Sequence, residues 1–340
     1  MAQRPSGEPV LFPHPLLLCD IGGTNVRYSM SAEPGAPAVF LNRAKTHAFP
    51  GLAQATRAAL GGLPVKPRSM IACAAGPVSG PRLKLTNADW LIDGAQTAAE
   101  LGLEQGLTLN DFEAMAYCLP VLARDDVRLI GQTPAPERGG PRLVLGPGTG
   151  LGLSALIEVD GRLAAIPSEG GHVDFGPLGA CEEQLWPHLE RAHGRITAEA
   201  VMSGPGLERL HAARLAMLGR APQNLTAAQI TKAGIQAEGL EREILRLLWN
   251  LVARFAGDMA LAFVARGGVT LAGGVLPRIV SLLEDQTFRA AFEDKAPMAA
   301  LSASIQTRLI VTDHAALSGM AAIGAAPERY AIDYSSRLWR

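Results

Sequence analysis

Six residues near the N-terminus, Asp20-Ile-Gly-Gly-Thr-Asn25, have the composition of a turn that handles phosphate. Apolar, strand-like segments flank this turn, and Gly22 and Gly23 are able to adopt positive φ, which would direct successive backbone N–H groups toward one anion-sized hollow. Asp20 is out of place beside a phosphate unless a cation lies between them. The combination therefore indicates nucleotide phosphate with Mg²⁺, although an ordinary glycine-rich hairpin fits the same pattern.

Two further glycine turns follow strand-like segments, at residues 146–152 and 273–274. Neither matches a standard nucleotide motif, because the chain has no G-x-x-x-x-G-K-[ST] sequence and the glycines of the 146–152 turn miss G-x-G-x-x-G. Three converging turns suit a nucleotide held between two lobes. Two turns would contact phosphates, and the third would let the backbone approach the base or ribose.

Several polar residues have the chemistry of substrate contacts. Asp111 follows a predicted strand, Leu107–Asn110, at the end where α/β sheets commonly bind ligands; the alternative is that it caps a helix. Glu169 and His172 flank two glycines and would pair with hydroxyl groups, unless they belong to a surface turn. Glu199 alone fits an exposed acid in the first turn of a helix.

Alternating strands and helices must position these residues. Leu16–Tyr28 reads as strand, glycine turn and strand, and Leu143–Ile157 repeats this order a domain's length downstream. One recurrence at this distance predicts two related α/β lobes facing one ligand, although chance similarity of two hairpins would give the same pattern. The predicted helices of the second lobe are Glu182–His193, Leu207–Met217 and Leu240–Ala265.

Composition excludes several classes of partner. The 340 residues include 31 basic and 32 acidic side chains without a like-charged block, so we expect no nucleic-acid partner and no membrane partner. Charged residues interrupt the longest apolar region, and prolines replace the apolar stretch that a signal peptide needs in Met1–Pro15. With four scattered cysteines, the sequence predicts a cytoplasmic protein with buried free thiols.

Taken together, the motifs resemble those of the bacterial glucokinase family, the ATP-dependent hexokinase-like branch of the actin/Hsp70/sugar-kinase superfamily. The resemblance extends from about Leu16 to Gly324. It rests on the following ordered motifs: Asp20-Ile-Gly-Gly-Thr-Asn25, Asn110-Asp-Phe112, Gly148-Thr-Gly-Leu-Gly152, Glu169-Gly-Gly-His-Val-Asp-Phe175, Ser203-Gly-Pro-Gly-Leu207, Ala272-Gly-Gly-Val275 and Phe288-Arg-Ala-Ala-Phe-Glu-Asp-Lys295.

The resemblance implies transfer of the γ-phosphoryl group of ATP to the 6-hydroxyl of D-glucose, the first step of glycolysis. Asp111 would be the catalytic base, and it would bind glucose together with Asn110, Glu169, His172 and Glu199. Asp20 would act on Mg²⁺ through water. The residues expected to contact the nucleotide and its phosphates are Asp20, Gly22, Gly23, Thr24, Asn25, Gly148, Thr149, Gly150, Gly273 and Gly274.

The family also implies an architecture of two RNase H-like lobes with a cleft between them, and a homodimer. We expect a flexible N-terminal tail at 1–15, a small α/β lobe at 16–111 joined by a C-terminal helix at 315–330, and a large α/β lobe at 112–314.

The sequence departs from the family pattern in its proline-rich start, which is longer than usual, and at residue 200. Ala200 stands beside Glu199 where relatives carry Arg, which would alter how Glu199 is oriented. Zinc-bearing relatives have clustered cysteines, whereas this chain matches them only at His172 and Cys181, so we expect no zinc.

Two other functions remain open from the sequence. A sugar-responsive regulator on a kinase fold is one, although we expect the roughly 15 residues before the first strand to be too few for a helix-turn-helix module. A kinase for another hexose is the second, and the sequence discriminates poorly against it.

Overall fold

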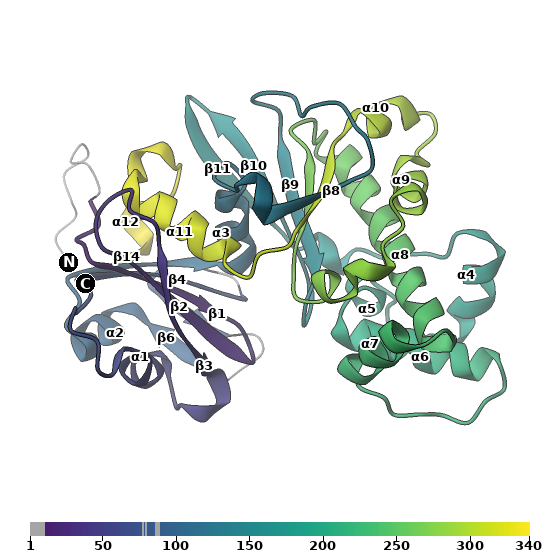
Figure 1. The fold of residues 1–340 in the computed structure, drawn as a ribbon, viewed down its shortest axis with the longest axis horizontal. Helices are drawn as coiled ribbons and strands as arrows, with labels where there is room; N and C mark the ends of the chain where they lie inside the picture. Colours follow the sequence, from purple (N-terminus) through teal and green to yellow (C-terminus); the bar gives the residue numbers. More distant parts are fainter. Residues whose placement is uncertain (1–10, 77, 79, 86–88) are drawn as a thin grey trace. The chain divides into compact units, whose positions relative to one another are not determined.

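The computed structural model describes residues 11–76, 78, 80–85 and 89–340. The chain forms two compact units. The first contains residues up to 126 together with 156–167 and 312–340, and the second contains 127–155 and 168–311. The described residues form two six-stranded sheets with helices packed on them, so the structure confirms the predicted mixed α/β class (Figure 1).

The sheet of the first unit has the order β14-β7-β4-β1-β2-β3. Its centre is parallel: β4 pairs with β1 on one side and with β7 on the other. These three strands are almost wholly buried, as expected for parallel strands covered on both faces. The strands are β1 (Leu16–Ile21), β2 (Asn25–Ser31), β3 (Val39–Lys45), β4 (Ser69–Ala74), β7 (Gln105–Asn110) and β14 (Leu338–Trp339), and a separate pair comprises β5 (Arg82–Lys84) and β6 (Leu91–Asp93).

Helices cover both faces of this sheet. Figure 1 shows α1 (Leu52–Leu60) and α2 (Gly94–Leu101) on one face and α11 (Ala315–Ala325) on the other. Packing on the α11 face is tight, since a Cβ at Gly324 would lie 2.2 Å from Leu16 Cδ2 of β1. The remaining helices are α3 (Asp111–Cys118), which follows β7 directly, and α12 (Tyr334–Arg337), which precedes β14.

Residues of the second unit supply most of another six-stranded sheet, and residues 156–167 of the first unit supply the rest. This sheet has the order β11-β10-β9-β12-β13-β8, in which β9, β12 and β13 run parallel and β8 is antiparallel to β13. Its core is aliphatic and centres on the long helix α8, whose Leu248 and Val252 are fully buried. The strands are β8 (Val127–Ile130), β9 (Arg142–Pro147), β10 (Leu151–Val159), β11 (Arg162–Ser168), β12 (Val269–Leu271) and β13 (Thr307–Ile310). The helices are α4 (Gly179–Leu185), α5 (Ala198–Val201), α6 (Gly204–Met217), α7 (Ala227–Gln236), α8 (Leu240–Ala262), α9 (Asp285–Glu293) and α10 (Ala299–Ser304).

One predicted helix is too long. Instead of Glu182–His193, the structure has α4 ending at Leu185, followed by a short 3-10 helix over Trp186–His188. Pro187 lacks a backbone N–H and cannot extend the hydrogen-bond ladder of α4. Helices α7 and α9 were absent from the sequence prediction, although the Thr226–Gln229 capping box at the start of α7 is readable in the sequence.

The division between units differs from the expected boundary at residue 111. Helix α3 belongs to the first unit because it packs backbone to backbone against α11. A Cβ at Gly319 of α11 would lie 2.6 Å from the Ala114 carbonyl oxygen and 2.8 Å from the Cys118 nitrogen. The segment 156–167 is held there too, since the Ala165 N–H donates to Tyr117 Oη at 3.3 Å.

The expected N-terminal tail, 1–15, falls into two parts. Residues 1–10 lie outside the described residues. Phe12, in the described part, is buried, and the carbonyl oxygens of Leu11 and Pro13 accept hydrogen bonds from Gln105 Nε2 (3.0 Å) and Ser69 Oγ (2.5 Å). Residues 11–15 are therefore fixed to the sheet of the first unit.

We expect Gly319→Val to lower the free energy of unfolding by about 1–3 kcal/mol, because the new side chain must separate α11 from α3. Chemical denaturation measures this change. The matched control is Gly61→Val, where a Cβ makes only ordinary contacts of 3.4 Å or more. Equal stability of the two variants would show that the helices do not require this close approach.

Candidate active site

In the first unit, the candidate residues lie at the carboxyl ends of β1 and β7. These strands flank β4, and Asp20 of β1 and Leu109 of β7 are both in register with Cys73 of β4. Burial, and then the nearby carboxylates of Asp20 and Asp111, raise the pKa of the Cys73 thiol well above its usual range. The neutral thiol donates to Asp20 Oδ1 at 3.7 Å. The carboxylates of Asp20 and Asp111 therefore both lie near Cys73, at the carboxyl end of the sheet.

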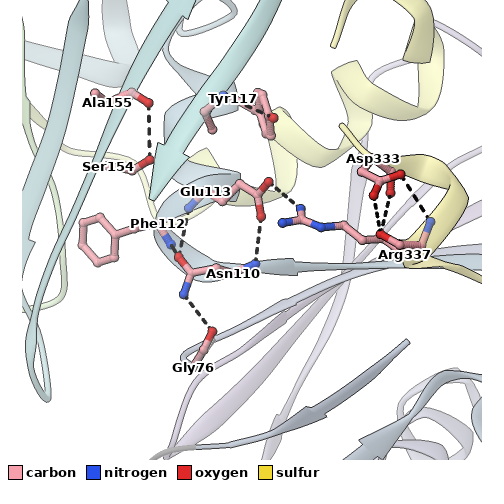
Figure 2. A network of polar contacts seen from close by, with 11 residues as sticks. Gly76, Asn110, Phe112, Glu113, Tyr117, Ser154, Ala155, Asp333 and Arg337 are labelled. Carbon is pink, nitrogen blue, oxygen red and sulfur yellow. Dashed lines mark hydrogen bonds and ion pairs between the residues drawn. The ribbon is translucent and has the colours of Figure 1, made fainter. Parts of the chain in front are cut away.

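A capping box at the start of α3 fixes the direction of the chain at Asp111 (Figure 2). Asn110 is the N-cap: its Oδ1 accepts from the N–H groups of Phe112 (2.9 Å) and Glu113 (3.1 Å). The carboxylate of Glu113 accepts in return from the Asn110 N–H at 3.3 Å. The alternative in which Asp111 caps this helix is therefore wrong. Asp111 is its first residue, and its Oδ1 accepts from the Phe112 N–H at 2.9 Å.

The Asn110 amide nitrogen also has a backbone partner. Its Nδ2 donates to the Gly76 carbonyl oxygen at 3.1 Å, as Figure 2 shows. A side-chain amide carries two N–H groups. One of them is directed at the Gly76 carbonyl oxygen, which fixes the plane of the amide.

The predicted phosphate turn is compact for a reason other than positive φ. Neither Gly22 nor Gly23 has a positive φ, which corrects that expectation. The turn closes instead through the Gly22 N–H, which donates to the Asn25 carbonyl oxygen at 2.9 Å, and a Cβ at Gly22 would lie 3.2 Å from the same oxygen. Thr46 supports it from outside, donating from Oγ1 to the Gly22 carbonyl oxygen at 2.7 Å.

Sequence reasoning missed the partner of Asp20. Arg27 lies opposite it in the β1–β2 pairing, and Arg27 Nη1 donates to Asp20 Oδ2 at 2.9 Å. The signal was present, because a hairpin closed by the 22–24 turn places these two residues across from each other. Arg27 fixes the carboxylate and places a cation beside the candidate phosphate turn.

In the second unit, Glu199 is held against the start of β10. Its Oε2 accepts from the Leu151 N–H at 2.8 Å, and a Cβ at Gly150 would lie only 2.5 Å from the same oxygen. The absence of a side chain at residue 150 is therefore what admits this carboxylate. Ala200, the next residue in sequence, is buried.

Glu169 and His172 lie beside Glu199. His172 Nε2 is 3.6 Å from Glu169 Oε2, and His172 Nδ1 is 3.9 Å from Glu199 Oε1, so the imidazole lies between two carboxylates. Gly171 presses the intervening turn onto β10, since a Cβ there would lie 2.3 Å from the Leu151 carbonyl oxygen. The side chains of Glu169 and His172 are exposed and able to offer both acceptors and a donor to a polyol.

The two nucleotide turns expected in this unit pack against each other. A Cβ at Gly146, just before the turn at 148–150, would lie 1.9 Å from the Ala272 carbonyl oxygen. Gly273 has a φ of +89°, and its Cβ would lie 2.3 Å from the Pro147 carbonyl oxygen. Thr149 and Gly274 are exposed next to this contact. The structure thus brings the two glycine turns of the second unit together.

The described part of the chain offers neither a metal cluster nor a membrane-spanning helix. No group of three or more His, Cys, Asp or Glu residues there has the arrangement of a metal site. None of the helices described is both long enough and apolar enough to span a bilayer.

The fold defines the class of protein, that of the two-lobed sugar kinases. The structure is similar to the crystal structure of glucokinase from an Antarctic psychrotroph, with a TM-score of 0.77, 31% identity, and coverage of 90% of this chain and 97% of that one. The fold is also shared with glucokinase from Balamuthia mandrillaris in complex with glucose, at a TM-score of 0.76, 22% identity, and coverage of 92% and 93%.

The sequence narrows the class to one family. The model of the glucokinase family matches residues 17–326, and the glucokinase of Brucella suis is 40% identical over 331 residues, which are 97% of this chain and 96% of the relative. The chain belongs to the glucokinase family. It is an ATP-dependent hexose kinase.

We expect Gly150→Ala to weaken glucose binding in the absence of nucleotide by about tenfold or more, because its Cβ displaces the Glu199 carboxylate from the Leu151 N–H. Isothermal titration calorimetry measures the dissociation constant. Gly176→Ala is the matched control, since its Cβ would meet no atom within 4 Å. Equal affinity of the two variants would show that glucose binding does not depend on Glu199 at this position.

Proposed function

We propose that Asp111 is the catalytic base of glucose phosphorylation. It would accept the proton of the 6-hydroxyl as that oxygen attacks the γ-phosphorus of ATP, giving glucose 6-phosphate and ADP. The observation that carries this role is the position of Asp111 at the first residue of α3, with one carboxylate oxygen already held by the Phe112 N–H. A fixed carboxylate suits a reaction whose rate depends mainly on alignment and charge stabilisation.

The remaining glucose hydroxyls would bind to Asn110, Glu169, His172 and Glu199. Each hydroxyl needs a donor and an acceptor, and these four side chains supply both kinds of group. A sugar that lacked one hydroxyl would leave a buried polar group without a partner, which gives such a site strong discrimination. The exposed Glu169 and His172 would become buried only with sugar bound.

ATP would bind through the glycine turns of both units. The turn 22–25 and the turn 148–150 would contact phosphates, and Gly273 and Gly274 would lie at the adenosine. The contact between the 146–150 and 272–274 segments supports a shared nucleotide role for the two turns of the second unit.

Mg²⁺ would arrive with ATP as part of the substrate, and it would help neutralise the charge of the transferring group. Asp20 fits a contact through water. Its two oxygens already face Arg27 and Cys73, but a carboxylate offers about four acceptor positions. Mg²⁺ also usually keeps several waters and is bound by few carboxylates, which agrees with a single acid at this turn.

We also propose that the enzyme is a homodimer, that it is located in the cytoplasm and that it catalyses the first step of glycolysis. Size-exclusion chromatography with light scattering tests the dimer.

The central test uses Asp111→Asn, which keeps the size of the side chain and removes its basicity. We expect kcat to fall by about 10²- to 10⁴-fold, with little change in the KM for ATP. A coupled assay of ATP-dependent phosphorylation, run on a panel of hexoses, measures both constants. Asp125→Asn, at an exposed acid of the same unit, is the control.

Two results would contradict the proposal. Near-normal turnover by Asp111→Asn would contradict the assignment of Asp111 as the catalytic base. If the wild-type protein binds glucose without phosphorylating it, the chain would act as a regulator, and preferential phosphorylation of another hexose would reassign the substrate.

A further inference from the structure

Glu113 is a buried carboxylate that the proposed reaction does not use directly. Its side chain is 5% exposed, and it lies two residues after Asp111 in the first turn of α3. One carboxylate oxygen, Oε2, closes the capping box by accepting from the Asn110 N–H. The direction of this carboxylate therefore bears on the two residues, Asn110 and Asp111, that begin the helix.

The other oxygen of Glu113 binds a residue from the far end of the chain. Arg337 Nη1 lies 2.6 Å from Glu113 Oε1, across 224 positions of sequence, as Figure 2 shows. Arg337 lies beyond residue 326, where the match to the glucokinase family model ends. The match to the family model therefore does not extend to this residue.

The C-terminal segment that carries Arg337 is built into the sheet. β14 pairs antiparallel with β7, the strand that leads to Asn110, with Trp339 in register with Gly106. Trp339 is buried, and its Nε1 donates to Thr108 Oγ1 of β7 at 3.1 Å. A Cβ at Gly94 or at Gly106 would lie 2.2 or 2.1 Å from the indole ring, so both glycines leave room for it.

We propose that Arg337 is a positioning residue of the phosphorylation reaction. Through Glu113 it holds the N-cap of α3, and through the cap it sets the direction of the Asn110 amide and the Asp111 carboxylate. The inference rests on the proposed function of Asp111. It makes residues 334–340 part of the support of the reaction centre.

Charge explains why Arg337 is needed. A buried carboxylate that loses its cation is strongly unfavourable, and it relaxes by drawing in water or a proton or by turning away. Each of these responses weakens the bond from the Asn110 N–H to Glu113. A glutamine at residue 113 would still accept that bond, since capping boxes use Glu or Gln, and it would have no charge to neutralise.

The experiment compares Arg337→Met, which keeps the length of the side chain without its charge, with Arg340→Met, an exposed arginine three residues further on. We expect kcat/KM for glucose to fall about 10- to 100-fold in Arg337→Met, because small displacements of reacting groups cost this much. The KM for ATP should stay at the wild-type value. Arg340→Met should match the wild-type protein in both constants.

Two further variants keep the test decisive even if Arg337→Met fails to fold. They are the double variant Arg337→Met/Glu113→Gln and the single variant Arg337→Lys. Both should recover most of the lost kcat/KM, the first because no charge is left unpaired and the second because the ion pair is retained. A purely structural anchor would change the melting temperature and leave the kinetic constants of the folded protein unaltered. That outcome, or an equal loss toward ATP and glucose, would overturn the inference.

Running wild-type protein and Asp111→Asn beside these variants separates the two claims. An inactive wild-type protein would contradict the proposed function. An active wild-type protein, an inactive Asp111→Asn and a normal Arg337→Met would leave the function in place and overturn only the positioning role of Arg337.

Discussion

The direction of Asp111 follows from hydrogen bonds made one residue before it. The Asn110 oxygen accepts from two N–H groups of the first turn of α3, and the Glu113 carboxylate returns a bond to the Asn110 backbone. These hydrogen bonds form inside a unit whose central strands are buried on both faces, so the start of α3 is fixed at Asp111. The parallel pairing of β7, β4 and β1 brings Asp20 to the same edge.

A different constraint shapes the second unit, where glycines admit polar groups and backbone that a side chain would exclude. Gly150 makes room for the Glu199 carboxylate, and Gly171 lets the turn with Glu169 and His172 reach β10. Close approach of the 146–147 and 272–273 segments follows the same rule. In both units a candidate carboxylate accepts from a backbone N–H group: Asp111 from Phe112 in the first, and Glu199 from Leu151 in the second.

The sequence was sufficient to predict the two α/β units and the places of the glycine turns, because strand patterns and turn residues are local signals. It predicted positive φ at Gly22, where the structure shows a close approach to the Asn25 carbonyl oxygen instead, because the two causes are not distinguishable without coordinates. It missed Arg27, Glu113 and Arg337 for different reasons. Predicting the Asp20–Arg27 pair requires the pairing register of the β1–β2 hairpin. The Glu113–Arg337 pair joins residues 224 positions apart, and no local sequence pattern indicates such a contact.

A crystal structure of the protein with glucose bound tests the account most directly, because its central claim is that the cap of α3 points the Asp111 carboxylate at the hydroxyl that reacts. We expect the glucose 6-hydroxyl within hydrogen-bond distance, about 2.6–3.2 Å, of the Asp111 carboxylate. The Asn110 cap should be unchanged. Glucose bound with its 6-hydroxyl on another residue, and Asp111 directed away from the sugar, would contradict the account.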